Sequence, residues 1–201
     1  MANWNDEMSF FERPATDMAM RAHYWIIERL EGLQGIKTNK CAIACFDVAL
    51  EHHLAISILI RAGAVGSAFS LVRSQFESFV RGMWLAQCAT NDVVENYEND
   101  NFKVPMGDMV KDLDAAIPNV NGYFTKLKND GWRAMNSYTH CGAHQVSRRF
   151  LNGDIFPGYS EKEIEEVAEL TTKIALGAAF ALAAYAERND ITDEINSYVP
   201  T

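Results

Sequence analysis

The sequence predicts an all-α protein, a helical bundle of about five long helices with a shorter helical insertion. Apolar residues recur every three or four positions over long stretches, which is the spacing of helices that bury one face. Proline is scarce, with five residues in 201, and no run of strict apolar–polar alternation is long enough for a convincing strand. Because one core suffices at this length, we expect residues 1–201 to form a single all-α domain.

The first three helices are predicted from apolar spacing and from the glycines that follow them. Residues 14–31 begin at a proline, which is favoured in the first turn of a helix, and end at Gly32. Residues 39–61 are apolar over much of their surface, and Gly63 is the predicted break. Residues 65–88 have the clearest pattern, with phenylalanines and valines on one face and charged residues beside them.

The middle of the chain is predicted to be an insertion, residues 91–130, that covers or decorates the bundle. Two short helices are expected there, over residues 91–102 and 104–117, and Pro118 ends the second. Residues 119–131 are rich in Asn and Gly, which is typical of turns.

Two further helices are predicted in the last third of the chain. The first spans residues 132–150, and residues 152–158 form a loop that contains an Asn-Gly and a Pro-Gly pair. The second spans residues 160–188. Ser160 and Glu163 have the spacing of a capping box, which marks its start.

Charge and cysteine content restrict the classes of function. The net charge of −9 argues against a protein that coats nucleic acid non-specifically, although it permits a local basic site. No signal peptide or membrane span is predicted, and the expected compartment is the cytoplasm. The cysteines show neither a CxxC pair nor a zinc-type spacing, so we expect reduced, mostly buried thiols at Cys41, Cys45, Cys88 and Cys141.

A polar stripe is the main candidate for a functional site. On a continuous helix over residues 132–150, one wedge about 120° wide collects several polar side chains. These side chains are Arg133, Asn136, Ser137, His140, His144, Ser147 and Arg148.

This combination of residues suits phosphate chemistry. Arginine presents a planar fork of donors that matches phosphate oxygens, and histidine can give or take a proton near neutral pH. Arg133 and His140 lie two turns apart and therefore share a face. Together they can position a phosphodiester and deprotonate a ribose 2′-hydroxyl without a metal.

A second row of charges lies on the predicted third helix. Arg73, Glu77 and Arg81 are spaced by one turn, so they can pair along the helix. One interpretation is a surface ladder of ion pairs. The functional interpretation is that this ladder faces the polar stripe, where Glu77 orients Arg133 or His140.

The segment from Arg133 to His140, RAMNSYTH, resembles the Arg-x(4–6)-His motif of the HEPN superfamily with its longest spacer. The segments LVRSQFE, ending at Glu77, and SYTHCG, ending at Gly142, also resemble uncharacterised bacterial helical proteins that are distantly HEPN-like and often lie near defence genes. The resemblance covers about residues 42–188.

The resemblance implies a homodimer in which paired helices bring two Arg–His motifs into one cleft. It also implies metal-independent cleavage of RNA that leaves a cyclic phosphate, with no cofactor. Arg133 then stabilises the phosphate and His140 acts as the base or acid. The implied assistants are Ser137, His144 and Arg148. Such proteins are often toxic or defensive, and an antitoxin or other partner protein often restrains them.

Two other functions stay open at this point. The first is a non-catalytic helical module that dimerises, which the negative charge favours, as does Ala134 at a position where the family prefers a polar residue. The second is a metal-dependent bundle enzyme, in which His140 and His144 bind an ion together with His52 or His53 or a nearby carboxylate. The polar stripe also has a simpler interpretation, as the solvated face of an amphipathic helix.

Overall fold

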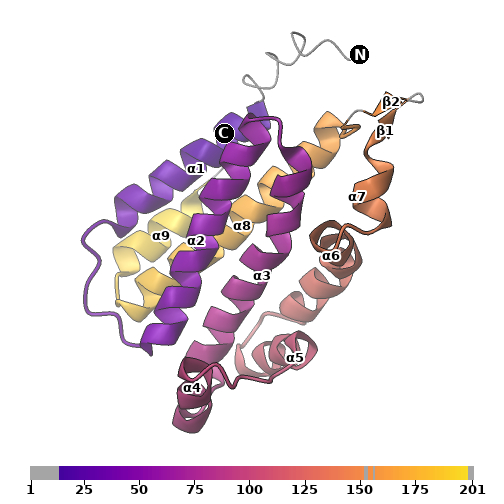
Figure 1. Cartoon of the computed structure of the whole chain (residues 1–201). Helices are drawn as coiled ribbons and strands as arrows, with labels where there is room; N and C mark the ends of the chain where they lie inside the picture. The colour runs from indigo at the N-terminus through magenta and orange to yellow at the C-terminus, as the bar shows by residue number, and fades with distance from the viewer. Residues whose placement is uncertain (1–13, 152–153, 156, 199–201) are drawn as a thin grey trace.

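A computed structural model describes residues 14–151, 154–155 and 157–198, and it confirms the all-α bundle (Figure 1). Over these residues the elements are α1 (Pro14–Leu30), α2 (Lys40–Arg61), α3 (Val65–Gln87), α4 (Asn91–Glu98), α5 (Met106–Ala116), α6 (Tyr123–Thr139), α7 (Ala143–Ser147), β1 (Phe150–Leu151), β2 (Asp154–Ile155), α8 (Glu161–Tyr185) and α9 (Asn189–Ser197).

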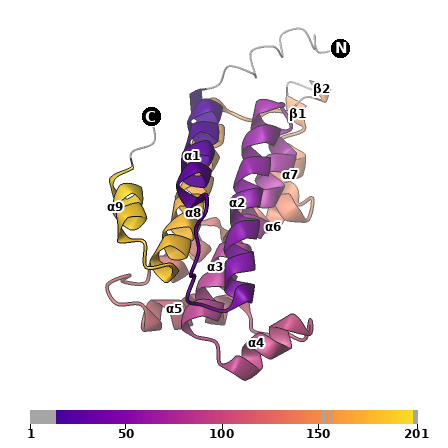
Figure 2. The same cartoon turned by 90° about the vertical axis from the view of Figure 1, so that its left-hand side faces the viewer.

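The centre of the bundle is a hairpin of α2 and α3, against which α8 packs. Helix α1 covers α2 and α8, whereas α5 and α6 pack on α3, on the opposite side of the bundle from α1 and α9 (Figures 1 and 2). The largest buried side chains of the hairpin include Phe46, Ile56 and Phe76. Because α3 lies between α2 and α6, its polar row faces side chains from both neighbours.

Gly82 allows α2 and α3 to approach closely. A Cβ at this position would lie 2.8 Å from Cε1 of Phe46 and 3.2 Å from the carbonyl oxygen of Ala42. We therefore expect Gly82→Ala to lower the free energy of unfolding by about 1–3 kcal/mol, as overpacking does. The measurement is denaturant unfolding, with Gly107→Ala as the control because nothing lies within 4 Å of its added Cβ. Equal effects of the two substitutions would contradict this account of the packing.

Helix α6 starts earlier than the sequence predicts. Residues 119–131 were expected to be turns, but the helix begins at Tyr123. The carboxylate of Asp114, at the end of α5, accepts the backbone N–H groups of Phe124 and Thr125, each at 2.9 Å. This carboxylate satisfies two of the free donors at the start of α6 from a different helix, so the local sequence does not reveal the cap.

The predicted helix over residues 132–150 is wrong in its second half. Helix α6 ends at Thr139, and Cys141 adopts a left-handed backbone conformation with φ 52°. The N–H of Gly142 donates to the carbonyl of Ser137 at 2.6 Å, which closes the end of the helix. Gly142 is needed here because an added Cβ would lie 2.6 Å from the Ser137 hydroxyl. The chain then restarts as the short helix α7.

The C-terminal third departs from the prediction at two places. Strands β1 and β2 form a small antiparallel hairpin, two residues each, which is too short to show alternation in the sequence. Residues 152, 153 and 156 of the predicted loop lie outside the described residues. The capping box of Ser160 and Glu163 is confirmed at the start of α8. The helix ends at Tyr185, before the predicted residue 188, because Glu187 has φ 56°, and α9 follows.

The two most apolar helices are α2 and α8. Both are long and apolar enough to cross a membrane, but a buried core helix passes the same test, and about half of each apolar window is buried in this fold. None of the four cysteines forms a disulfide, in agreement with the prediction of free thiols. Cys41 and Cys45 are buried, Cys88 is half-buried and Cys141 is exposed.

Candidate functional site

The candidate site is a contact between α3 and the C-terminal end of α6. The Nη1 atom of Arg73 lies 2.8 Å from Nε2 of His140. Because a guanidinium can only donate, Nε2 is the acceptor, and in this arrangement the imidazole is neutral with its proton on Nδ1. The structure therefore brings together two of the residues that the sequence singled out, on elements far apart in the chain.

Arg73 is held on three sides. Its Nε donates to Oε1 of Glu77 at 2.7 Å, and its guanidinium lies 4.8 Å from the ring centre of Trp132. Both Arg73 and Glu77 are about one-fifth exposed, so water screens their ion pair less than a fully exposed one. Glu77 also lies 3.8 Å from Arg81. Of this row, Arg73 contacts His140, whereas Arg81 lines a pocket with residues of α2 and α4. Glu77 reaches His140 only through Arg73.

Hydrogen bonds fix the end of α6 against α3. The hydroxyl of Ser70 donates to the carbonyl of Tyr138 at 2.9 Å. The hydroxyl of Thr139 lies 3.2 Å from the carbonyl of Ser70 and 2.9 Å from that of Met135 in its own helix. The ring of Tyr138 packs edge-on against Phe69, with ring centres 5.2 Å apart. These contacts place His140, which follows Thr139, within reach of Arg73.

Arg133 and Asn136 lie on the exposed side of α6. Arg133 is exposed and forms no hydrogen bond or ion pair with the described residues, so its guanidinium is free to bind an anion. It lies two helical turns before His140, on the same side of the helix. Asn136 is half-buried, one turn before His140, and its Oδ1 is buried without a partner among the described residues.

The predicted stripe does not continue past His140. Ser137 accepts the backbone N–H of His144 at 2.9 Å, so its hydroxyl joins α6 to α7. His144 itself is exposed on α7. Because the helix is broken at Cys141, the seven polar residues do not share one face, and the wedge over residues 132–150 was wrong.

Arg148 does not lie near His140 but contacts the start of α8. It forms an ion pair with Glu163 of the α8 capping box. Burial opposes ionisation of Glu163, but hydrogen bonds from Ser160 and the charge of Arg148 outweigh it and hold the pKa of Glu163 below its usual value. Arg148 lines a hollow of about 230 Å³ together with Ala134, Tyr138 and His144. Its role there is to attach α7 to α8.

The histidines predicted to bind a metal do not come together in the structure. His53 is fully buried and its Nε2 lies 3.2 Å from the hydroxyl of Thr172 in α8, away from His140. Among the described residues there is no group of three or more His, Cys, Asp or Glu side chains arranged to hold an ion.

Trp132 is the site residue that the sequence did not assign. Its ring lies under the guanidinium of Arg73 and edge-on to Phe76. A signal was present, because Trp132, Asn136 and His140 follow one another at four-residue spacing and therefore share an edge of α6.

The fold and the site together define an all-α bundle with an arginine–histidine cluster between its third and sixth helices. The chain belongs to the family of unknown function DUF6988, whose model matches residues 46–200. No curated protein and no solved structure matches the chain. The resemblance to the HEPN superfamily therefore stays a prediction.

Proposed function

We propose that this protein is a metal-independent endoribonuclease of a bacterial defence or toxin–antitoxin type, which acts as a homodimer at the Arg73–His140 cluster. The observation that carries the proposal is the 2.8 Å contact between these two side chains, with Arg133, which has no partner among the described residues, on the same side of α6. Two arginines and a neutral histidine supply phosphate binding and proton transfer, which are the two requirements of RNA cleavage without a metal.

The proposed reaction begins when a phosphodiester binds Arg133 and takes the Nη1 donor of Arg73 away from His140. The freed Nε2 lone pair of His140 then accepts the proton of the ribose 2′-hydroxyl. The 2′ oxygen attacks phosphorus, the bond to the 5′ oxygen breaks, and the leaving oxygen takes a proton from water. The hydroxide that remains takes the proton from His140, which restores the neutral imidazole. The products are a 2′,3′-cyclic phosphate and a 5′-hydroxyl end. Glu77 and Trp132 keep Arg73 oriented throughout.

The same contact favours a second candidate, a non-catalytic helical interaction module. In the free protein Arg73 occupies the lone pair of His140, and Glu77 balances the charge of Arg73, so the three side chains also form a closed structural link between α3 and α6. The net charge of −9 is more common in proteins that do not bind RNA. The two candidates make different predictions: the nuclease cleaves RNA and loses this activity when His140 is replaced, whereas the interaction module leaves RNA intact.

The test is induction of the protein in growing cells, followed by examination of total RNA. We expect the wild type to arrest growth and fragment RNA, and Arg133→Ala and His140→Ala to do neither while accumulating to the same level. Intact RNA and normal growth with the wild-type protein would favour the interaction module.

A further inference from the structure

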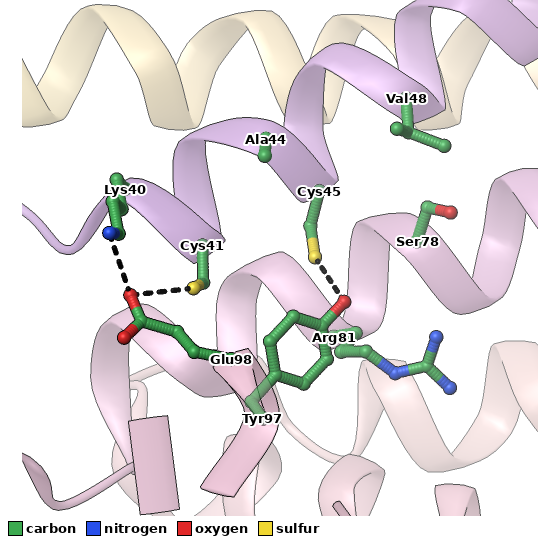
Figure 3. Close-up of a pocket in the computed structure, with 9 residues that line it drawn as sticks. All are labelled: Lys40, Cys41, Ala44, Cys45, Val48, Ser78, Arg81, Tyr97 and Glu98. Atoms are coloured by element: carbon green, nitrogen blue, oxygen red, sulfur yellow. Dashed lines mark hydrogen bonds and ion pairs between the residues drawn. The ribbon is translucent and has the colours of Figure 1, made fainter. Parts of the chain in front are cut away.

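A separate pocket of about 610 Å³ opens between α2, α3 and α4 (Figure 3). Its walls are Ala44, Cys45 and Val48 from α2, Ser78 and Arg81 from α3, and Tyr97 from α4. This volume is within the range of small-molecule sites in proteins. The pocket lies one to two turns along α3 from the Arg73–His140 cluster, and neither that cluster nor the proposed reaction uses it.

Arg81 has donors without an adequate acceptor. Its Nε is buried and has no hydrogen-bond partner among the described residues. Its ion-pair partner, Glu77, is 3.8 Å away and makes a closer bond, at 2.7 Å, with Arg73. The Arg81 side chain is 28% exposed and makes no hydrogen bond with the described residues, so its guanidinium can bind an anion that enters the pocket.

Ser78 lies one turn before Arg81 on the same wall of the pocket (Figure 3). It is half-buried and makes no hydrogen bond with the described residues. A hydroxyl and a guanidinium at this spacing lie side by side on a helix. Together they offer donors that converge on one acidic group.

The other polar groups of the pocket satisfy one another. The thiol of Cys45 lies 3.3 Å from the hydroxyl of Tyr97, and Glu98 accepts from Cys41 at 3.6 Å and from Lys40 at 3.1 Å (Figure 3). Burial raises the pKa of Cys45, and burial together with the thiol contact raises the pKa of Tyr97 to about 12, so both groups are neutral at physiological pH. Arg81 therefore supplies the unbalanced charge of the pocket.

We propose that this pocket binds a small acid that carries a flat aromatic ring. Arg81 and Ser78 hold its carboxylate or phosphate, and its flat apolar body lies against the ring of Tyr97 and the side chains of Val48 and Ala44. The fork of an arginine matches either type of acid, and an aromatic ring suits the mixed apolar wall. The inference does not rest on the proposed nuclease activity, since it depends on different side chains.

The test is isothermal titration calorimetry of the full-length protein with two probes, salicylate as an aromatic carboxylate and adenosine 5′-monophosphate as an aromatic phosphate. We expect one of them to bind, and which one binds identifies the acid. Arg81→Gln should weaken that binding about 10- to 100-fold, because it removes a charge-assisted hydrogen bond. Val48→Trp, at a partly exposed position, should weaken it by filling the pocket.

Two controls make the result decisive. Arg188→Gln removes an exposed arginine that pairs with Asp190 at the α8–α9 junction and does not line the pocket, so it should leave binding unchanged. Salicylamide and adenosine, which lack the acidic group, should not bind. The proposal is overturned if neither probe binds at millimolar concentration, or if Arg81→Gln binds the probe as tightly as the wild type does.

Discussion

Acidification from about pH 7.5 to about pH 4.5 is expected to remove about 3 kcal/mol from the free energy of unfolding through His53 alone. This side chain is fully buried between α2 and α8, and the ring of His23 from α1 lies 5.6 Å away. Burial, with a smaller contribution from His23, lowers the pKa of His53 from 6.5 to about 3. The hydroxyl of Thr172 offers a hydrogen bond but no charge to balance a cation.

The free energy of unfolding falls on acidification because the unfolded state binds a proton at a higher pH than the folded state does. As the pH falls below 6.5, His53 of the unfolded chain becomes protonated, whereas His53 of the folded chain stays neutral until about pH 3. The unfolded state therefore binds more protons in this window, and stability falls by about 1.4 kcal/mol for each pH unit. The buried His23 has a lowered pKa for the same reason and adds to the loss in the same direction.

Denaturant unfolding at the two pH values, compared across three proteins, isolates the contribution of His53. His53→Gln keeps a group that can bond Thr172 but cannot titrate, so it should lose about 3 kcal/mol less than the wild type. His144→Gln, at an exposed position on α7, is the matched control and should behave as the wild type does. The same loss in all three proteins would show that His53 does not govern acid stability.

Arg73→Ala is expected to reduce RNA cleavage about 10- to 100-fold, and His140→Ala about 100- to 10,000-fold, the usual contribution of a general base. Arg73 acts both on the phosphate and by positioning His140, so the two substitutions should not be additive in the double variant. Arg73→Lys keeps the charge but loses the forked guanidinium that joins Glu77 to His140. Its rate of RNA cleavage should therefore lie between those of the wild type and Arg73→Ala. The measurement is the initial rate of cleavage of a labelled RNA at saturating and limiting concentrations.

The control for these variants is Arg188→Ala, because that arginine is exposed and directly precedes α9, a helix on the opposite side of the bundle from α6 (Figure 1). It should leave the rate unchanged. A positional role for Arg73 also has a spectroscopic signature. In the wild type, nitrogen NMR should show His140 with an unprotonated Nε2 and a protonated Nδ1, and Arg73→Ala should lose this preference. A wild-type spectrum with the proton on Nε2 would contradict the assignment of the contact.

The long helices were predictable because their apolar spacing is a local property of the sequence. Helices α1, α2, α3 and α8 begin and end within a few residues of the predictions, and the capping box of Ser160 marks the start of α8. The start of α6 was not predictable, because Asp114 caps it from another helix. The break after Thr139 carried one local signal, Gly142, but the apolar spacing on both sides favoured a continuous helix.

The candidate site was predictable only in part. Charge spacing on α3 and the Arg133–His140 pair on α6 singled out both members of the contact, since each row is regular on a helical wheel, but only Arg73 and His140 meet, and Arg133 stays exposed. The actual bond, between Arg73 and His140, depends on how Ser70 and Tyr138 set the two helices against each other. His144 and Arg148 were assigned to the site only because the helix was drawn unbroken. The pocket beside Arg81 was missed because it forms only where α4 lies against α2 and α3, and the spacing of residues within each helix does not give that arrangement.

The most direct test of the central claim is incubation of the purified protein with an end-labelled RNA in the presence of a chelator. We predict cleavage by the wild type, products that end in a 2′,3′-cyclic phosphate, and no cleavage by His140→Ala purified in the same way. RNA that stays intact with the wild-type protein, or is cut equally by His140→Ala, would contradict the claim that the Arg73–His140 cluster is a ribonuclease site.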